Sequence, residues 1–157
     1  MRPVRIERAG AQNCAEIEPL FSAYRSFYRL APDPQRALLY LSERLEHGES
    51  VLFLARSERR AVGFTQLYPS FSSLGMRAAW ILNDLFVVPE ARQMGIARML
   101  VARAEGFAQE SGAGSIWLQT GIENLAAQHL YESAGYERDV AFYRYDKALV
   151  TQPASPA

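Results

Sequence analysis

The amino-acid sequence predicts one α/β domain with a mixed central sheet. Three observations support this class. The chain has 157 residues, close to the usual size of a single domain. Segments with apolar side chains at alternate positions are interleaved with segments whose apolar side chains recur every three or four positions. No repeat, linker or low-complexity block divides residues 1–150, which are expected to form that domain, whereas residues 151–157 hold two prolines and are expected to form a disordered tail.

The first half of the chain is expected to place two helices between strands. Residues 4–8 alternate apolar and polar side chains, which is typical of a half-buried strand. Two later segments have apolar residues at helical spacing, and prolines or a glycine follow them as stop signals. These predicted helices are residues 11–30 and 37–45. Apolar runs of strand length follow at 51–55, 61–68 and 78–88, with a Ser-rich loop predicted at 69–75.

The second half continues the alternation of helices and strands. Residues 95–109 and 125–133 have helical spacing, and glycines close both segments. Residues 115–120 form a predicted strand between them. The segment 136–145 is rich in residues that favour strands and is predicted to hold two of them, with a turn near Arg138 and Asp139. The predicted sheet therefore has about six or seven strands, flanked by about four helices.

Composition and charge exclude several classes of protein. Lys and Arg number 17, Asp and Glu also number 17, and the isoelectric point is near 6.7, so bulk electrostatics exclude a nucleic-acid partner. No apolar run approaches the ~20 residues of a membrane helix, and no signal-peptide core follows the N-terminus, so a cytoplasmic protein without a membrane partner is expected. Cys14 is the only cysteine, which rules out an internal disulfide, and it gives no metal-site spacing with the two histidines.

The densest chemical signal lies in residues 85–98, where an apolar strand ends at Pro89 and a loop of small residues opens into a helix. Backbone N–H groups at a helix N-terminus point toward one position, and the helix dipole favours an anion there. Gly95 and Ala97 leave room for a phosphate to approach, and Arg92 adds a charged donor. A pyrophosphate fits these features. An ordinary strand-to-helix turn is the alternative interpretation.

Neither a Walker motif nor a three-glycine dinucleotide motif is present. The spacing Arg92-x-x-Gly95-x-Ala97, after a strand that reads Leu-x-Val-x-Pro, instead resembles the acyl-coenzyme A loop of the GNAT N-acetyltransferase superfamily. Residues 124–136 resemble the other signature of that family, Asn-x-x-Ala-x-x-Leu-Tyr-x-x-x-Gly-Phe/Tyr. The predicted element order also suits the family fold, an α+β fold whose mostly antiparallel sheet splays apart at the cofactor site.

The resemblance implies a transfer from acetyl-CoA to an amine by direct attack in a ternary complex, with no metal. It also implies that Tyr131 protonates the leaving thiolate, and a phenol with a pKa of roughly 10 suits a thiol with a pKa of roughly 8.5. Asn124 has the alternative role of a helix cap. The residues implied to bind the cofactor are Leu85, Phe86, Val87, Arg92, Gln93, Met94, Gly95, Ile96, Ala97, Arg98, Asn124, Ala127 and Tyr131.

Residues for the acceptor amine come from the strand before the loop and from the first predicted helix. Asp84 is the only ionisable residue on that part of the strand, and it is the candidate general base. Strict alternation places Asp84 on the face opposite Leu85 unless a β-bulge turns it. A structural carboxylate, with water chains as the base, is the alternative. Asn83, which alternation places on the face of Leu85, and the pair Tyr24 and Tyr28 are the predicted acceptor-binding residues.

The leading hypothesis is an N-acetyltransferase for a small primary amine, such as an amino acid or a polyamine. The stretch 83–85 resembles small-amine, diamine and histone-like members of the superfamily, although the diamine members have an acidic residue in place of Asn83. A protein lysine or N-terminal acetyltransferase, and a non-catalytic CoA-binding regulator, are the alternatives. The aromatic segment around Phe142, Tyr143 and Tyr145 is expected to pair with a second chain in a homodimer.

Overall fold

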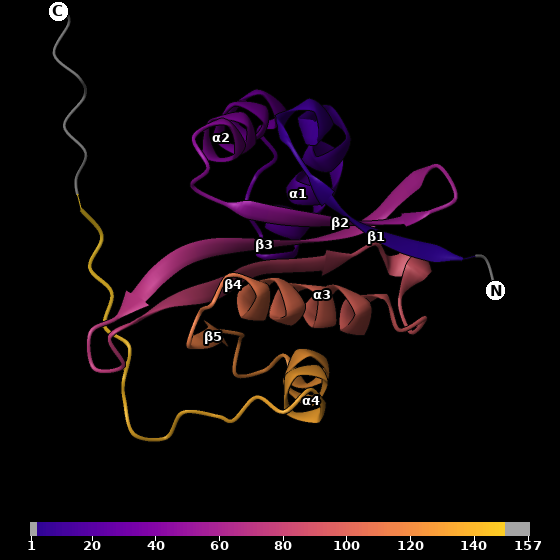
Figure 1. Ribbon diagram of the computed structural model, residues 1–157. Helices are drawn as coiled ribbons and strands as arrows, with labels where there is room; N and C mark the ends of the chain where they lie inside the picture. The colour runs from indigo at the N-terminus through magenta and orange to yellow at the C-terminus, as the bar shows by residue number, and fades with distance from the viewer. Residues whose placement is uncertain (1–2, 150–157) are drawn as a thin grey trace, which may run out of the picture.

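The computed structural model describes residues 3–149, so the tail predicted at 151–157 lies outside the described residues. Within residues 3–149, five strands and four helices follow one another, with two short 3-10 turns (Figure 1). The strands are β1 (Val4–Ala9), β2 (Val51–Ser57), β3 (Arg60–Ser72), β4 (Arg77–Val87) and β5 (Ser115–Leu118). The helices are α1 (Cys14–Phe27), α2 (Pro34–Glu46), α3 (Ile96–Glu110) and α4 (Leu125–Ser133), and the turns are η1 (Ala11–Asn13) and η2 (Pro89–Ala91).

The strands form one open sheet in the order β1-β2-β3-β4-β5. Strands β1 to β4 are antiparallel neighbours, whereas β5 is parallel to β4, because α3 carries the chain back across the sheet between them. Figure 1 shows α1 and α2 on one face of the sheet and α3, with α4 beyond it, on the other. These features confirm the predicted mixed, mostly antiparallel sheet with its four helices.

Apolar side chains on both faces of the sheet form the core. On the face covered by α1 and α2, Ile17, Leu41 and Phe64 are fully buried. On the opposite face, the ring of Phe53 packs edge-on against Phe107 of α3, with 5.7 Å between the ring centroids. Burial of one such side chain contributes ~1.5–3 kcal/mol. The helices are therefore held on the sheet by their apolar stripes.

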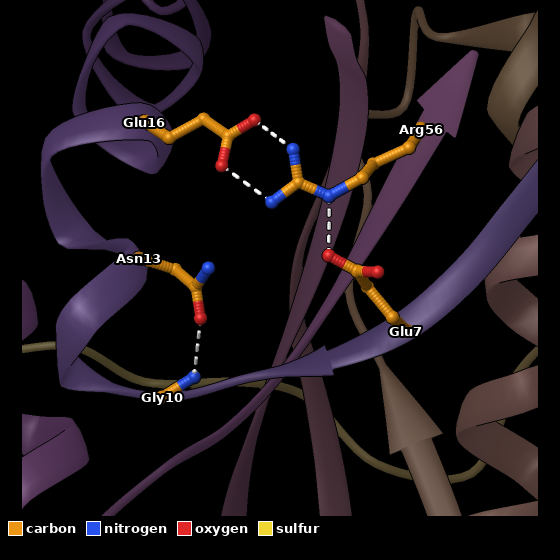
Figure 2. Close-up of polar contacts among 5 residues, drawn as sticks. All are labelled: Glu7, Gly10, Asn13, Glu16 and Arg56. Atoms are coloured by element: carbon orange, nitrogen blue, oxygen red, sulfur yellow. Dashed lines mark hydrogen bonds and ion pairs between the residues drawn. The ribbon is translucent and has the colours of Figure 1, made fainter. Parts of the chain in front are cut away.

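A cluster of charged and polar residues fixes the start of α1 to the sheet (Figure 2). Arg56, near the end of β2, pairs with Glu16 of α1 through both terminal nitrogens and with Glu7 of β1 through Nε. The Gly10 N–H donates to Asn13 Oδ1 at 3.0 Å in the turn between β1 and α1. Bidentate, charge-assisted pairs constrain orientation as well as distance. These contacts set the direction of α1, whose C-terminal half reaches the candidate site.

Several element boundaries differ from the predicted ones. The helix predicted at 11–30 is shorter, because a 3-10 turn precedes α1. The second helix begins earlier than predicted, at Pro34, because Asp33 Oδ1 accepts a hydrogen bond from the Arg36 N–H at 3.1 Å and caps it. The Ser-rich segment 69–75 is mostly strand rather than loop, because β4 pairs with β3 along that length.

The prediction of two strands in residues 136–145 is wrong, since residues 136–149 contain no strand. The aromatic pattern is that of a strand, but a strand needs a neighbour to receive its hydrogen bonds, and no described strand pairs with this segment. Its side chains extend into solvent: Phe142 is 79% exposed and Tyr143 is 88% exposed. The sheet therefore has five strands among the described residues instead of six or seven.

Candidate functional site

The loop between β4 and α3 presents an uncapped helix N-terminus. Gly95 immediately precedes α3 and has a φ of 77°, a left-handed value that glycine adopts without strain. Gln93 also has a positive φ, 61°, so the backbone turns sharply twice before the helix. No side chain caps α3 and no acidic residue stands in its first turn. The first N–H groups of α3 and the positive end of its dipole therefore suit an anion.

The two arginines predicted to bind phosphate have different surroundings. Arg92 Nε donates to the Val87 carbonyl oxygen at 3.0 Å, and its guanidinium lies 5.8 Å from the centre of the Phe86 ring. Arg98 reaches α4 instead, where its terminal nitrogens donate to Ser133 O at 2.9 Å and to Ser133 Oγ at 3.3 Å. Arg92 thus lies beside the loop, whereas Arg98 joins α3 to α4.

Most of the other predicted cofactor residues have their side chains in or against the core. For these residues, the backbone is the part that a ligand can contact. The buried ones are Phe86, Val87 and Ile96, and Leu85, Ala97 and Ala127 are half-buried against the core. Gln93 and Met94, by contrast, are exposed on the loop.

Helix α4 contains the second motif. Asn124 caps it, because Asn124 Oδ1 accepts a hydrogen bond from the Ala127 N–H at 3.2 Å, so the alternative role of Asn124 as a cap is confirmed. Tyr131 is 8% exposed and packs edge-on against Tyr136, with ring centroids 5.8 Å apart. Burial, and to a smaller extent the neighbouring Tyr28, raise the pKa of Tyr131 to about 12. The phenol is therefore protonated at neutral pH, as a proton donor must be.

A β-bulge in β4 lies immediately before Asp84. Gln66 of β3 pairs with Asp84, whereas the next residue of β3, Leu67, pairs with Leu82, so Asn83 is the extra residue. The prediction that Asn83 shares the face of Leu85 by alternation is therefore wrong, because the bulge interrupts the alternation there, and the Asn83 side chain is exposed. Asp84 remains opposite Leu85 and points toward α1.

Asp84 is the buried end of a hydrogen-bond network. Its Oδ2 accepts from Gln66 Nε2 at 2.9 Å, its Oδ1 accepts from Asn83 Nδ2 at 3.1 Å, and the Tyr24 phenol also bonds to the carboxylate. Asp84 is 4% exposed. Burial raises the pKa of the Asp84 carboxyl above its ordinary value, and the hydrogen bonds from Gln66, Tyr24 and Asn83 oppose this rise. A buried carboxylate with a raised pKa is suited to accept a proton.

The network continues to α2 through residues that the sequence analysis did not assign to the site. Gln66 Nε2 also donates to Tyr68 Oη at 3.0 Å, and the Tyr68 and Tyr40 hydroxyls lie 2.5 Å apart. Burial is the largest cause that raises the pKa of Tyr68. Gln66 could have pointed to this network in the sequence, because it is an amide in a mostly apolar strand. A fully buried amide needs hydrogen-bond partners.

Tyr24 and Tyr28 lie between the two predicted catalytic residues. Their rings are edge to face, with centroids 5.2 Å apart. Tyr24 bonds to Asp84, and Tyr28 is near enough to Tyr131 to raise its pKa. Burial, followed by the charge of Asp84, raises the pKa of Tyr24 far above its ordinary value. The structure thus brings Asp84, Tyr24, Tyr28 and Tyr131 together, whereas Asn124 is used as a cap.

A cleft of about 1330 Å³ opens on the other side of Tyr131. Its walls are β5, including Trp117, the adjoining face of α4 and parts of the segment 136–144. Tyr24 and Asp84 do not line it. Tyr131 therefore separates this cleft from the Asp84 network.

An open mixed sheet, an uncapped helix after its fourth strand and a buried phenol on the next helix are the features that the resemblance to the acyl-CoA-dependent GNAT superfamily implied. The model of the Acetyltransferase (GNAT) family matches residues 15–136, and the chain belongs to this family. The chain is 46% identical over 142 residues to an uncharacterized N-acetyltransferase, YhfO, of Bacillus subtilis strain 168, over 90% of this chain and 95% of the relative.

Solved structures agree with this assignment. The crystal structure of a probable acetyltransferase superposes with a TM-score of 0.87 at 39% sequence identity, over 94% of this chain and 99% of that one. An aminoglycoside N-acetyltransferase in complex with CoA has a TM-score of 0.80 at 20% identity, over 95% of this chain and 97% of that one, which shows the shared fold alone. The chain is therefore an acetyltransferase of a family that uses acetyl-CoA.

Two further properties bear on partners. No helix in the described part of the chain is long and apolar enough to cross a membrane. Residues 3–149 also contain no group of three or more His, Cys, Asp or Glu side chains placed to hold a metal ion.

Proposed function

We propose that this enzyme acetylates the primary amine of a small molecule, such as an amino acid or a polyamine. The observation that supports this proposal best is the connection from the half-buried Tyr24 to the buried Asp84. The rings of Tyr24 and Tyr28 can receive an ammonium group, and the Asp84 carboxylate lies behind them. The aminoglycoside N-acetyltransferase of the same fold, whose acceptor is a small-molecule amine, is consistent with this class of acceptor.

Acetyl-CoA supplies the activated acetyl thioester. Its pyrophosphate would meet the backbone N–H groups at Gly95 to Arg98 and the Arg92 guanidinium, since no acidic side chain opposes an anion in the first turn of α3. The backbone of residues 85–87 would hold the thioester and the pantetheine arm. Asn124 and Ala127 would line the other side, with the Asn124 side-chain N–H groups still able to donate beyond the cap. Gln93, Met94 and Ile96 would contribute mainly through the loop backbone.

Three groups of this chain would move the protons. The acceptor ammonium passes a proton to Tyr24 Oη as Tyr24 passes its own proton to Asp84, which leaves a neutral amine. The amine nitrogen attacks the thioester carbon, and the C–S bond breaks as Tyr131 gives its proton to the sulfur. The new amide nitrogen then returns a proton to Tyr131. Asp84 releases the remaining proton to solvent, so the products are the N-acetyl amine, CoA thiol and one proton.

Thiol release from acetyl-CoA across a panel of amines tests this function. We expect turnover with one class of free amino acid, polyamine or amino sugar, and loss of that turnover in Asp84→Asn. Turnover confined to lysine-containing peptides or to peptide N-termini would contradict a small-molecule acceptor. Thermal unfolding with acetyl-CoA is the matched control, because a ligand at 100 times its Kd adds ~2.7 kcal/mol of stability even when no acceptor has been found.

We further propose that the enzyme acts in the cytoplasm as a homodimer. The location is supported by the thiol of Cys14, which is unpaired and buried and suits a reducing environment. The homodimer is supported by the exposed aromatic residues of the C-terminal segment. Fractionation of cells and the mass of the purified protein test the two statements separately.

A further inference from the structure

Helix α4 contains the proposed proton donor but has few connections to the rest of the molecule. It is nine residues long, and Tyr131 is its one buried residue. An isolated helix shorter than ~12 residues is only marginally stable in water. Gln128 bonds to the carbonyl oxygens of Gly121 and Ile122, which lie in the loop before the helix. Arg138, just after the helix, donates to Gln128 Oε1. These bonds join α4 to its own flanking segments and do not place it on the body of the enzyme.

Arg98, in the first turn of α3, supplies the missing tie. Its terminal nitrogens donate to Ser133 O at 2.9 Å and to Ser133 Oγ at 3.3 Å. Among the described residues, these are the only hydrogen bonds that join α4 to another helix or to a strand. Ser133 is the last residue of α4, so its carbonyl oxygen has no partner inside the helix. A cation at this end of α4 also meets the negative end of the helix dipole.

The same contact turns the Arg98 side chain away from the loop before α3. The sequence analysis expected Arg98 to bind the pyrophosphate, but its guanidinium is engaged with α4. Arg92 lies beside the loop instead, where its Nε donates to the Val87 carbonyl oxygen at 3.0 Å. Arg92 is therefore the arginine available to an anion, and Arg98 has a different role.

The residue that Arg98 holds is two positions from Tyr131. Tyr131 O accepts from the N–H groups of Ala134 and Tyr136, both at 3.0 Å. Ser133 Oγ also donates to Leu130 O at 2.8 Å. The last turn of α4 is thus one hydrogen-bonded unit that contains Tyr131 and Ser133, and a displacement of one moves the other. A proton donor must lie within hydrogen-bond distance of the atom that it protonates.

We propose that Arg98 is a positioning residue, which holds the last turn of α4 against the first turn of α3 and thereby keeps the Tyr131 phenol within reach of the leaving thiolate. This inference rests on the proposed role of Tyr131 as the proton donor. It assigns the Arg98 side chain no contact with the phosphates of acetyl-CoA. Only the backbone N–H of Arg98 takes part in the proposed pyrophosphate site.

Two acetyl donors separate positioning from phosphate binding. S-acetylpantetheine carries the same thioester as acetyl-CoA but lacks the pyrophosphate. We expect Arg98→Met to lower kcat by ~10–100-fold with both donors, because a small displacement of a catalytic group has an effect of this size. The Kd of acetyl-CoA should stay close to the wild-type value. Arg103→Met is the matched control on α3, since Arg103 pairs with Glu110 of the same helix, and it should have wild-type kcat.

A double-mutant cycle tests whether Arg98 acts through Tyr131. If it does, Arg98→Met causes no further loss of kcat in a Tyr131→Phe background. The same loss in both backgrounds would overturn the proposal. So would an Arg98→Met variant that binds acetyl-CoA more weakly and turns over S-acetylpantetheine normally, because that result would make Arg98 a phosphate ligand.

Amide hydrogen exchange provides a measurement that needs no acceptor. Arg98→Met should speed the exchange of the amides of residues 130–136, whereas Arg103→Met should match the wild type. Unchanged exchange in that segment would overturn the proposed tie between α3 and α4. Failure of every amine to support turnover would contradict the proposed function, and the exchange measurement would still decide whether Arg98 holds α4.

Discussion

The Gln66 side-chain amide donates a hydrogen bond to the Asp84 carboxylate at 2.9 Å, across the pair of strands β3 and β4 and directly beside the β-bulge at Asn83. Both side chains are buried, so this bond satisfies a polar atom of each that water cannot reach. The same amide also donates to Tyr68, which links the carboxylate to α2. The carboxylate is thus held in place by the sheet, and the Tyr24 phenol connects it to α1.

Replacement of Asp84 by Asn should abolish most of the amine acetylation. Removal of a general base typically lowers the rate by ~10²–10⁴-fold. Asn retains the size of Asp84 and can still accept from Gln66, so acetyl-CoA binding should be unchanged. Steady-state kinetics should show the loss in kcat for the acceptor found by the amine panel. Tyr24→Phe should produce a loss of the same kind, because it removes the hydroxyl between Asp84 and the acceptor. Wild-type turnover in both variants would assign Asp84 a structural role.

The same substitution should change how stability depends on pH. The pKa of Asp84 is raised in the folded state by burial, above an unfolded value of ~3.9. The folded state therefore binds the proton more tightly, so the contribution of Asp84 to stability is fully present below pH ~4 and is lost as the pH rises through the raised folded pKa. Asp84→Asn lacks this titration, so the melting temperature of the variant relative to wild type should increase with pH. Parallel melting curves from pH 4 to pH 8 would contradict the raised pKa.

Tyr131→Phe should lower kcat by ~10²-fold or more and leave the affinity for acetyl-CoA nearly unchanged. Because the pKa of Tyr131 is about 12, the phenol keeps its proton through the usual assay range. Wild-type kcat should therefore show no decline from loss of this proton until the pH approaches 12. Tyr136→Phe is the matched control and should be active. The centroid of the Tyr136 ring lies 5.8 Å from that of the Tyr131 ring. Equal losses in the two variants would point to packing rather than proton donation.

The two motifs can be read directly in the sequence, and they were sufficient to predict the family fold and the loop before α3. These features depend on local patterns, such as the strand that ends at Pro89 and the glycine at position 95. The bulge at Asn83 was not predictable, because it is set by which residues of β3 pair with β4. Gln66 and Tyr68 lie two residues apart on β3, but their connection to Tyr40 was missed because it depends on the packing of α2 against the sheet.

The C-terminal segment, residues 137–149, shows a different limit of local pattern. Residues 140–145 have strand-forming side chains, but in the single chain they pair with no strand. Strand propensity measures how well a side chain fits a pleated, half-buried surface. It therefore does not identify which chain supplies that surface. An exposed segment with this composition is therefore consistent with the homodimer proposed above.

Arg56→Met should destabilise the fold by about 1 kcal/mol, because it removes one cation from between Glu7 and Glu16 and leaves both carboxylates near one another. For a chain of this size, that change corresponds to a decrease of about 2–4 °C in melting temperature. Arg60→Met is the control, since the Arg60–Glu90 pair joins side chains that are 69% and 56% exposed. Its melting temperature should match the wild type closely. A similar decrease in both variants would show that the Arg56 cluster has no special role in fixing α1.

Substitution of alanine for two glycines in the region of α3 should change the stability of the protein in opposite directions. Gly95 has a φ of 77°, and no atom lies within 4 Å of the position that a Cβ would take, so Gly95→Ala costs conformational energy of about 1–2 kcal/mol without a clash. Gly106 lies inside α3, where a Cβ would meet only Arg103 at 3.7 Å, so Gly106→Ala should stabilise by ~0.5–1 kcal/mol. Because Gly95 shapes the N-terminus of α3, its substitution should also reduce the increase in melting temperature that acetyl-CoA produces, and Gly106→Ala should leave that increase intact. An undiminished acetyl-CoA shift in Gly95→Ala would exclude this loop as the pyrophosphate site.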